Sequence, residues 1–205
     1  MALGGCSALP VLSFGDIGSS TQSGQGSEET NAPDGDGGSA GSGGFAGGLA
    51  GSEWIPDDAW PATVTYVHDG DTLYLLPDDY SNAGSASRAN NSSSDELKVR
   101  LIGIDTPEIG ENDECYGEEA RELLRDFLPE GTHVWAIEDE DAFDPYGRSL
   151  LYLFTDDGYF VNFDMISLGA AEAVLFQPND EYYGELREVE QEAQDAGLGM
   201  WGACR

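Results

Sequence analysis

The sequence contains almost no lysine. Lys98 is the only one, and it stands with seven arginines and two histidines against 40 aspartates and glutamates. The formal net charge is −32 over 205 residues. In dilute buffer such a charge repels other polyanions and opposes the chain's own compact state. Molar salt screens most of that repulsion, because the Debye length falls to roughly 3 Å at 1 M. We therefore expect a salt-adapted, halophilic protein, with an acidic protein of ordinary cytoplasm as the alternative.

Long apolar runs are also missing. No stretch of about 18 apolar residues occurs, so the sequence contains no ordinary transmembrane helix. Cys6 follows Leu3-Gly4-Gly5, which resembles the lipobox of secreted lipoproteins, where the cysteine is lipidated. The charged and apolar regions that precede such a cysteine are not present, so either the start codon lies upstream or the match is chance.

The first 52 residues have the composition of a flexible tether. Of the 28 glycines, 15 lie between Gly4 and Gly51, mixed with serine, asparagine and aspartate. We expect a disordered segment over 1–52 and one folded domain over 53–205. This arrangement favours an exported protein, either extracellular or anchored to the outer face of the cytoplasmic membrane through lipid on Cys6. In an exported protein the isolated pair Cys115 and Cys204 indicates a disulfide, and two free thiols are the alternative.

The folded part alternates between strand and helix patterns. TVTYV and TLYLL flank the turn HDGD, and LKVRLIGI, THVWAIE and GRSLLYLFT are further strands. Helices are predicted in YGEEARELLRDFL, VNFDMISLG and DEYYGELREVEQEAQDAG. Residues 77–96 lack an apolar period and predict a long loop. Five strands with a helix after the third are typical of an α+β protein built on a five-stranded OB-fold β-barrel with three helices.

Three acids stand where these strands turn or end. Antiparallel pairing of the second and third strands brings Asp71 near Asp105. Two carboxylates and the Thr106 carbonyl supply the hard oxygen ligands that Ca²⁺ accepts. Glu108 is suited to orient or deprotonate an attacking water. Pro107 fixes its own φ and restricts Thr106, so it holds these groups in place.

Two arginines complete the pattern. Arg100 points outward from the third strand, and Arg148 lies in DPYGRS at the start of the fifth. Guanidinium groups form bidentate hydrogen bonds with phosphate oxygens, so a metal and two arginines can together neutralise a phosphate. Taken singly, each of these residues also has a plainer interpretation as a turn former, a solvated acid or a surface ion pair.

The ordered set of motifs resembles the staphylococcal nuclease, or thermonuclease, family from about Ala62 to Trp201. The pieces that carry the resemblance are DGDT at 69–72, RLIGIDTPE at 100–108, YGEEA at 116–120, YGR at 146–148, VNFDMISLGAAEA and the terminal GLGMW. The resemblance implies a Ca²⁺-dependent phosphodiesterase, an endonuclease that acts on DNA and RNA and leaves 3′-phosphates. It implies metal ligands Asp71, Asp105 and Thr106, catalytic residues Arg100, Glu108 and Arg148, and a substrate contact at Tyr146.

Two departures from the family pattern concern substrate contacts. The lysine that often precedes the tyrosine of YGR is Pro145 here, and the aromatic pair that flanks a bound nucleotide appears as Val174 and Phe176.

We expect a monomeric nuclease. The main rival is a non-catalytic OB-fold module that binds nucleic acid, and a third hypothesis makes the acidic loops calcium-binding scaffolding.

Overall fold

The computed structural model describes residues 55–79, 81, 83–85, 96–110 and 113–204, all of which belong to the unit Gly44–Arg205. The predicted tether 1–52, its boundary with the folded domain and Cys6 lie outside the described residues. Most of the predicted loop 77–96 lies outside them as well.

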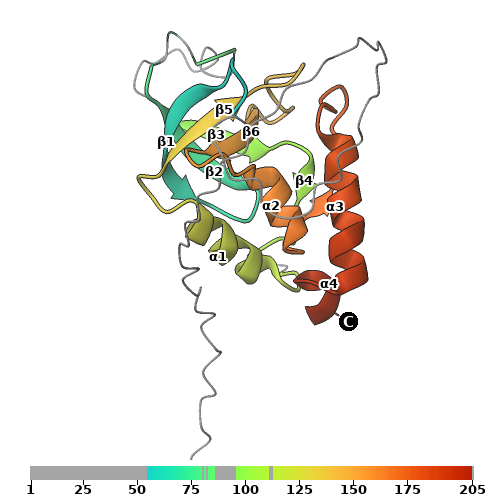
Figure 1. Cartoon of the computed structure of the whole chain (residues 1–205). Coiled ribbons are helices and arrows are strands. Elements are labelled where there is room, and N and C mark those ends of the chain that lie inside the picture. Colours follow the sequence, from blue (N-terminus) through green and yellow to red (C-terminus); the bar gives the residue numbers. More distant parts are fainter. Residues whose placement is uncertain (1–54, 80, 82, 86–95, 111–112, 205) are drawn as a thin grey trace, which may run out of the picture. The chain divides into compact units, whose positions relative to one another are not determined.

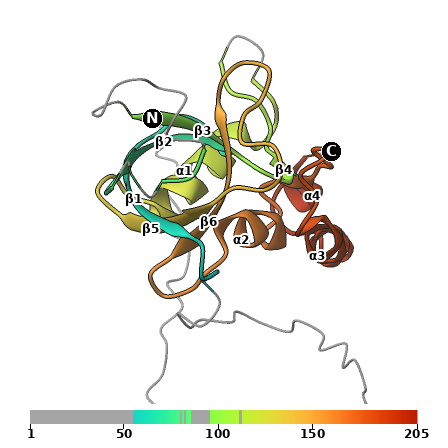
Figure 2. The ribbon, with the colours of Figure 1, turned by 90° about the horizontal axis from the view of Figure 1, so that it is seen from above.

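Five strands of the described part form a closed barrel, in the order β1-β2-β3-β6-β5. These strands are β1 (Trp60–Val67), β2 (Thr72–Pro77), β3 (Leu97–Leu101), β5 (His133–Ile137) and β6 (Ser149–Thr155). Neighbours pair antiparallel except β3 and β6, which run parallel and close the ring seen from above in Figure 2. The five-stranded barrel predicted from the sequence is confirmed.

Alternation along the strands fills the barrel with aliphatic side chains. Ala62, Val64, Leu73, Leu75 and Val99 are fully or almost fully buried, while their neighbours face outward. In β1 the register shifts between Val64 and Tyr66, which marks a β-bulge.

Three helices surround the barrel, as predicted, and a short fourth follows them. They are α1 (Gly117–Phe127), α2 (Val161–Ser167), α3 (Tyr183–Ala196) and the four-residue α4 (Met200–Ala203). Ala120 and Leu124 on one stripe of α1, and Leu128 directly after it, are buried in the barrel core, and burial of one leucine contributes about 1.5–3 kcal/mol. Figures 1 and 2 show α1 across one end of the barrel and α2 and α3 together at its side. None of the helices in the described ranges is long and apolar enough to cross a bilayer.

The third strand is shorter than predicted, because the chain turns after Leu101. Gly103 has a φ of 78°, which favours glycine, and a Cβ there would lie 2.5 Å from Leu186. Beyond this turn, β4 (Ile104–Asp105) pairs antiparallel with β7 (Glu172–Ala173) in a small second sheet. The end of LKVRLIGI therefore leaves the barrel and carries Asp105 toward α3.

Candidate active site

The turn between β1 and β2 holds Asp71 through its own backbone. An Asp69 carboxylate oxygen accepts hydrogen bonds from the N–H groups of Asp71 (3.1 Å) and Thr72 (2.6 Å). The Asp71 carbonyl accepts a further bond of 2.9 Å from Leu101 N–H at the end of β3. Gly70 packs so closely that a Cβ there would lie 2.8 Å from the Thr106 side chain. The hairpin and the segment after β4 are thus fixed to each other.

The Asp71 carboxylate is buried and fully partnered. One oxygen accepts hydrogen bonds from Thr106 N–H (3.0 Å) and Thr106 Oγ1 (3.1 Å), and the other accepts one from Thr72 Oγ1 (3.0 Å). Arg100 approaches the first oxygen at 3.0 Å. Burial raises the pKa of Asp71 to about 6, and the Arg100 guanidinium opposes that rise. A second cation beside this carboxylate would favour its charged form.

Arg100 joins the two predicted metal-binding acids. Besides Asp71, its guanidinium contacts Asp105 at 2.5 Å and donates hydrogen bonds to the carbonyls of Ile104 (2.8 Å) and Leu101 (3.2 Å). The Arg100 side chain is only 6% exposed, whereas that of Asp105 is 58% exposed. The Phe176 ring covers the guanidinium, with its centroid 5.4 Å from Arg100 Cζ. The Asp105 carboxylate is therefore open to solvent on one side and contacts the buried Arg100 guanidinium on the other.

A buried acid on α3 supports the strand that carries Asp105. One Glu190 oxygen accepts a 3.0 Å hydrogen bond from Ala173 N–H, and the other pairs with Arg187 on the same helix. Ala173 and Glu172 pair with Ile104 and Asp105 across the small sheet. Glu190 thus fixes β7, and β7 fixes β4.

Glu108 stands in an exposed loop whose backbone is clamped. Its N–H donates to the Glu114 carboxylate at 3.0 Å, and its carbonyl accepts from Glu114 N–H at 2.9 Å. A Cβ on Gly117 would lie 2.7 Å from the Glu108 carbonyl oxygen, so the start of α1 packs against this loop.

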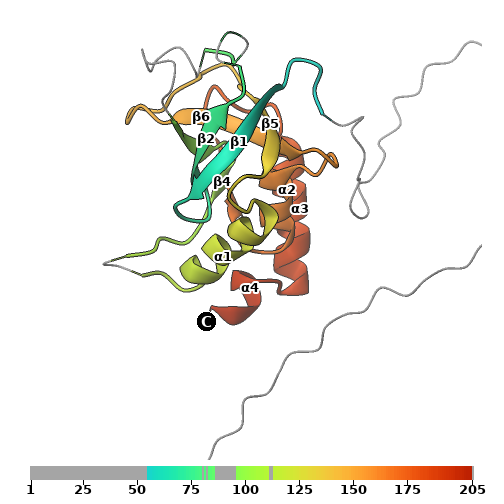
Figure 3. The same ribbon diagram turned by 90° about the vertical axis from the view of Figure 1, so that its left-hand side faces the viewer.

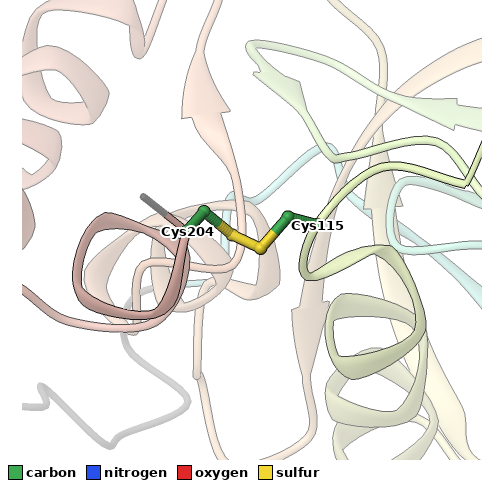
Figure 4. Close-up of a disulfide and its surroundings, with 2 residues drawn as sticks. All are labelled: Cys115 and Cys204. Carbon is green, nitrogen blue, oxygen red and sulfur yellow. A yellow bond between two sulfur atoms is a disulfide. The ribbon is translucent and has the colours of Figure 1, made fainter.

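The predicted disulfide is present in the structure. Figure 4 shows it joining Cys115, before α1, to Cys204 at the end of α4.

Arg148 directly precedes β6 and is held by the loop before it. Its Nε contacts Asp144 at 2.5 Å, and the exposed Tyr146 ring lies against it, 5.8 Å from Arg148 Cζ. The hydrogen bonds from Arg148 and the backbone N–H of Tyr146 help hold the pKa of Asp144 below its ordinary value, although burial opposes this. Because Ser149 pairs with Val99 in parallel, Arg148 lies level with Lys98, two residues before Arg100 on β3.

The structure brings the predicted residues together to different extents. Asp71, Arg100, Asp105 and Thr106 form one connected cluster. Among the described residues, neither Glu108 nor Arg148 makes an ion pair with that cluster. Glu108 follows Thr106 by two residues, and Arg148 directly precedes β6, the strand that pairs with β3.

The donor set matches a hard cation. Two carboxylates and a backbone carbonyl are oxygen donors of the kind Ca²⁺ prefers, with water completing the shell. The described residues contain no group of three or more His, Cys, Asp or Glu side chains placed to hold a metal. The expected set includes only two such side chains, so a bound cation would rely on the Thr106 carbonyl and on water.

Sequence reasoning missed several supporting residues. Glu190 sits between Val189 and Ala193 on the buried stripe of α3, and an acid at a stripe position is the signal that could have found it. The Asp69 contacts follow from the turn-forming character of an aspartate two residues before its partner. Nothing in the sequence marks Glu114 apart from the acids around it.

A closed five-stranded barrel that places two carboxylates around a buried arginine defines the class of protein as an OB-fold domain with a charged site suited to a phosphate group. The family model described as staphylococcal nuclease homologue matches residues 98–203. The thermonuclease of Staphylococcus intermedius is 32% identical over 141 residues, which cover 67% of this chain and 74% of that protein. The chain belongs to the staphylococcal nuclease family, and the predicted class of enzyme, a micrococcal-nuclease-like hydrolase, is thereby confirmed.

Two further relatives come from Bacillus subtilis strain 168. The SPbeta prophage-derived endonuclease YokF is 33% identical over 107 residues, which are 50% of this chain and 36% of that protein. Endonuclease YncB is 33% identical over 107 residues, which are 50% of each chain. This chain therefore spans half or less of these two endonucleases.

Proposed function

We propose that this nuclease requires Ca²⁺ and hydrolyses phosphodiester bonds of DNA and RNA, leaving 3′-phosphates. The observation that carries the proposal is the cluster in which buried Arg100 contacts both Asp71 and Asp105, with Glu108 starting from the same segment. Product polarity and metal preference are what the resemblance to the staphylococcal nuclease family implies.

Asp71, Asp105 and the Thr106 carbonyl would hold the cation. When bound, it supplies positive charge to the phosphate and lowers the pKa of a nearby water. Arg100 contacts both of these carboxylates, and its guanidinium would serve phosphate oxygens when the two acids hold the cation. The buried position of Arg100 keeps water from screening that charge.

The chain's own groups then share the chemistry. Glu108 accepts the proton of the attacking water or orients that water, from a backbone held by Glu114. Arg100 and Arg148 hold the phosphate oxygens and stabilise the charge that develops during attack. Tyr146, exposed beside Arg148, offers a ring to the substrate.

Export and salt adaptation are also part of the proposal. The Cys115–Cys204 disulfide suits an oxidising compartment, and the net charge of −32 suits high salt. We place the protein outside the cell or on the outer face of the cytoplasmic membrane through lipid on Cys6, as a monomer. A urea midpoint that stayed flat between about 0.1 and 3 M KCl would count against the screening argument.

The test is cleavage of single-stranded DNA and RNA in Ca²⁺ and in chelator, followed by analysis of the new ends. The proposal expects Ca²⁺-dependent fragments with 3′-phosphates that accept no polymerase extension. Fragments with 3′-hydroxyls would contradict the proposed polarity. Tight binding without any cleavage would instead favour the non-catalytic OB-fold module.

A further inference from the structure

A row of side chains crosses the outer face of the barrel beside the candidate active site. The register pairs Tyr66 of β1 with Tyr74 of β2, and Tyr74 with Lys98 of β3. The Tyr66 and Tyr74 rings lie 6.0 Å apart, and the His68 ring lies 6.4 Å from Tyr66. Three rings and one ammonium group thus follow one another across three strands.

The bulge in β1 helps create this row. The register shifts between Val64 and Tyr66, and the Thr65 hydroxyl donates a 3.1 Å hydrogen bond to the Tyr74 carbonyl. A bulge of this kind re-aims the side chain that follows it. Tyr66 is 42% exposed as a result, and Figure 3 shows β1 and β2 with no described helix in front of them.

Lys98 differs from the other cations of the described chain. Each of the five described arginines has an acidic partner within ion-pair distance, whereas Lys98 has none among the described residues. In a chain with 40 acids, an exposed cation without an acidic partner is available to an anion from outside.

The row continues the candidate active site. Lys98 lies two residues before Arg100 on the same face of β3, a separation of roughly 7 Å at the usual strand rise. Val99 pairs with Ser149, so Lys98 also runs beside Arg148. A strand of nucleic acid whose scissile phosphate met Arg100 and Arg148 would have its neighbouring phosphate within reach of Lys98.

We infer that Tyr66, His68, Tyr74 and Lys98 form an extended subsite for the single-stranded nucleic-acid substrate, and we name it the tyrosine row. The rings stack on bases next to the scissile phosphate, and Lys98 pairs with the adjacent phosphate. Aromatic rings with a cation alongside are the combination that binds single strands without sequence preference. The inference rests on the proposed function for the position of the scissile phosphate.

Base stacking would also let this strongly acidic chain bind nucleic acid in high salt. Phosphate contacts lose affinity as salt rises, because counterion release then contributes little. Base stacking carries no such penalty. A row with three rings and one cation is therefore suited to a protein with a charge of −32 that works in concentrated salt.

The test measures binding rather than cleavage. Fluorescein-labelled single-stranded oligodeoxynucleotides of about 4 and 12 nucleotides are titrated with Glu108→Gln protein in about 1 M KCl, and anisotropy is recorded. The same protein then carries Tyr66→Leu, Tyr74→Leu or Lys98→Gln. Leucine keeps the apolar cover of the strands and removes the ring. Tyr159→Leu is the matched control, because Tyr159 is also 42% exposed but lies in the turn before α2.

The tyrosine row predicts that each tyrosine variant weakens binding of the longer strand about tenfold, with little change for the shorter one. The Lys98→Gln loss should shrink between about 0.5 and 2 M KCl, while the tyrosine losses persist. Affinities equal to that of the Tyr159 control would overturn the inference. If wild-type protein failed to cleave but the tyrosine variants still lost affinity, the proposed function would fail and the tyrosine row would stand.

Discussion

The Asp71 carboxylate and the Arg100 guanidinium lie 3.0 Å apart, and both side chains are more than nine-tenths buried. This contact joins the β1–β2 turn to the end of β3, and through Asp105 it extends to β4. A single arginine therefore stabilises two carboxylates that would otherwise repel each other.

Removing that arginine should destabilise the fold. Arg100→Gln leaves a buried carboxylate without its cation, and such changes cost about 3–5 kcal/mol. Ca²⁺ should restore part of the loss, because it supplies positive charge to the same two acids. Urea unfolding with and without Ca²⁺ measures both effects. Arg121→Gln, whose ion pairs on α1 are more exposed, should change stability by about 1 kcal/mol or less, and an equal loss in both variants would contradict this account.

Glu114 should affect turnover more than substrate binding. Its carboxylate and N–H hold the Glu108 backbone at 3.0 and 2.9 Å, so Glu114→Ala loosens the segment that aims the base. We expect kcat to fall about tenfold or more, with KM little changed, since small displacements of a catalytic group are costly. Glu119→Ala on α1 is the control, because it changes an exposed acid. Equal rates for the two variants would show that Glu114 has no part in positioning.

The disulfide should contribute strongly to stability. Cys115 and Cys204 are separated by 89 residues, and closing a loop of that length stabilises by about 4–5 kcal/mol on the chain-entropy model. Cys115→Ser with Cys204→Ser should lower the urea midpoint accordingly. Dithiothreitol should move wild-type protein to the same midpoint and leave the double variant unchanged. A further shift of the double variant by dithiothreitol would point to a different cause.

Asp164 makes stability depend on pH. It lies in α2 beside an open cleft lined also by Asp126, Asp156 and Asp157, and burial raises its pKa to about 6 from an ordinary value of 3.8. The charged form is thus disfavoured in the folded state, so this acid reduces stability progressively as pH rises from about 4 to above 6.

Asp164→Asn should therefore raise the free energy of unfolding at pH 7 by about 1–2 kcal/mol, a value reduced for partial exposure, with no gain near pH 4. Asp156→Asn should change the free energy of unfolding in the opposite direction. The pKa of Asp156 is lowered mainly by its hydrogen bond with His133, so removing this charge should reduce stability at pH 7. Urea titrations at both pH values compare the two variants, and a pH-independent effect of Asp164→Asn would contradict the assignment.

The sequence predicted the barrel and three helices because apolar alternation and the 3.6-residue stripe report burial directly. The predicted helix DEYYGELREVEQEAQDAG ends at Gly197, and in the structure Gly197 follows α3 with a φ of 63°. The closing parallel pair β3–β6 was not predicted, since parallel neighbours far apart in sequence leave no local signal. The break of the third strand at Gly103 and the small β4–β7 sheet depend on contacts with Leu186 and Glu190 that only the fold reveals.

The same division holds in the candidate site. Asp71, Arg100 and Asp105 were predicted together, because hairpin pairing places the start of one strand beside the end of the next. The direct contact of Arg100 with both acids was not foreseen, since the sequence only showed it on the outward face of β3. Val174 and Phe176 stand where the family resemblance places an aromatic pair, and in the structure the Phe176 ring covers Arg100, a contact that the sequence did not indicate.

Glu108 provides the most direct test of the central claim, which is that this site hydrolyses phosphodiester bonds with Ca²⁺ and a glutamate. Single-turnover cleavage of single-stranded DNA is measured in about 2 M KCl for wild-type and Glu108→Gln protein, with Ca²⁺ and with chelator. The account predicts Ca²⁺-dependent cleavage that falls about 10²- to 10⁴-fold in the variant, while Ca²⁺ binding by calorimetry is retained. Undiminished cleavage by Glu108→Gln, or none by folded wild-type protein that binds Ca²⁺, would contradict it.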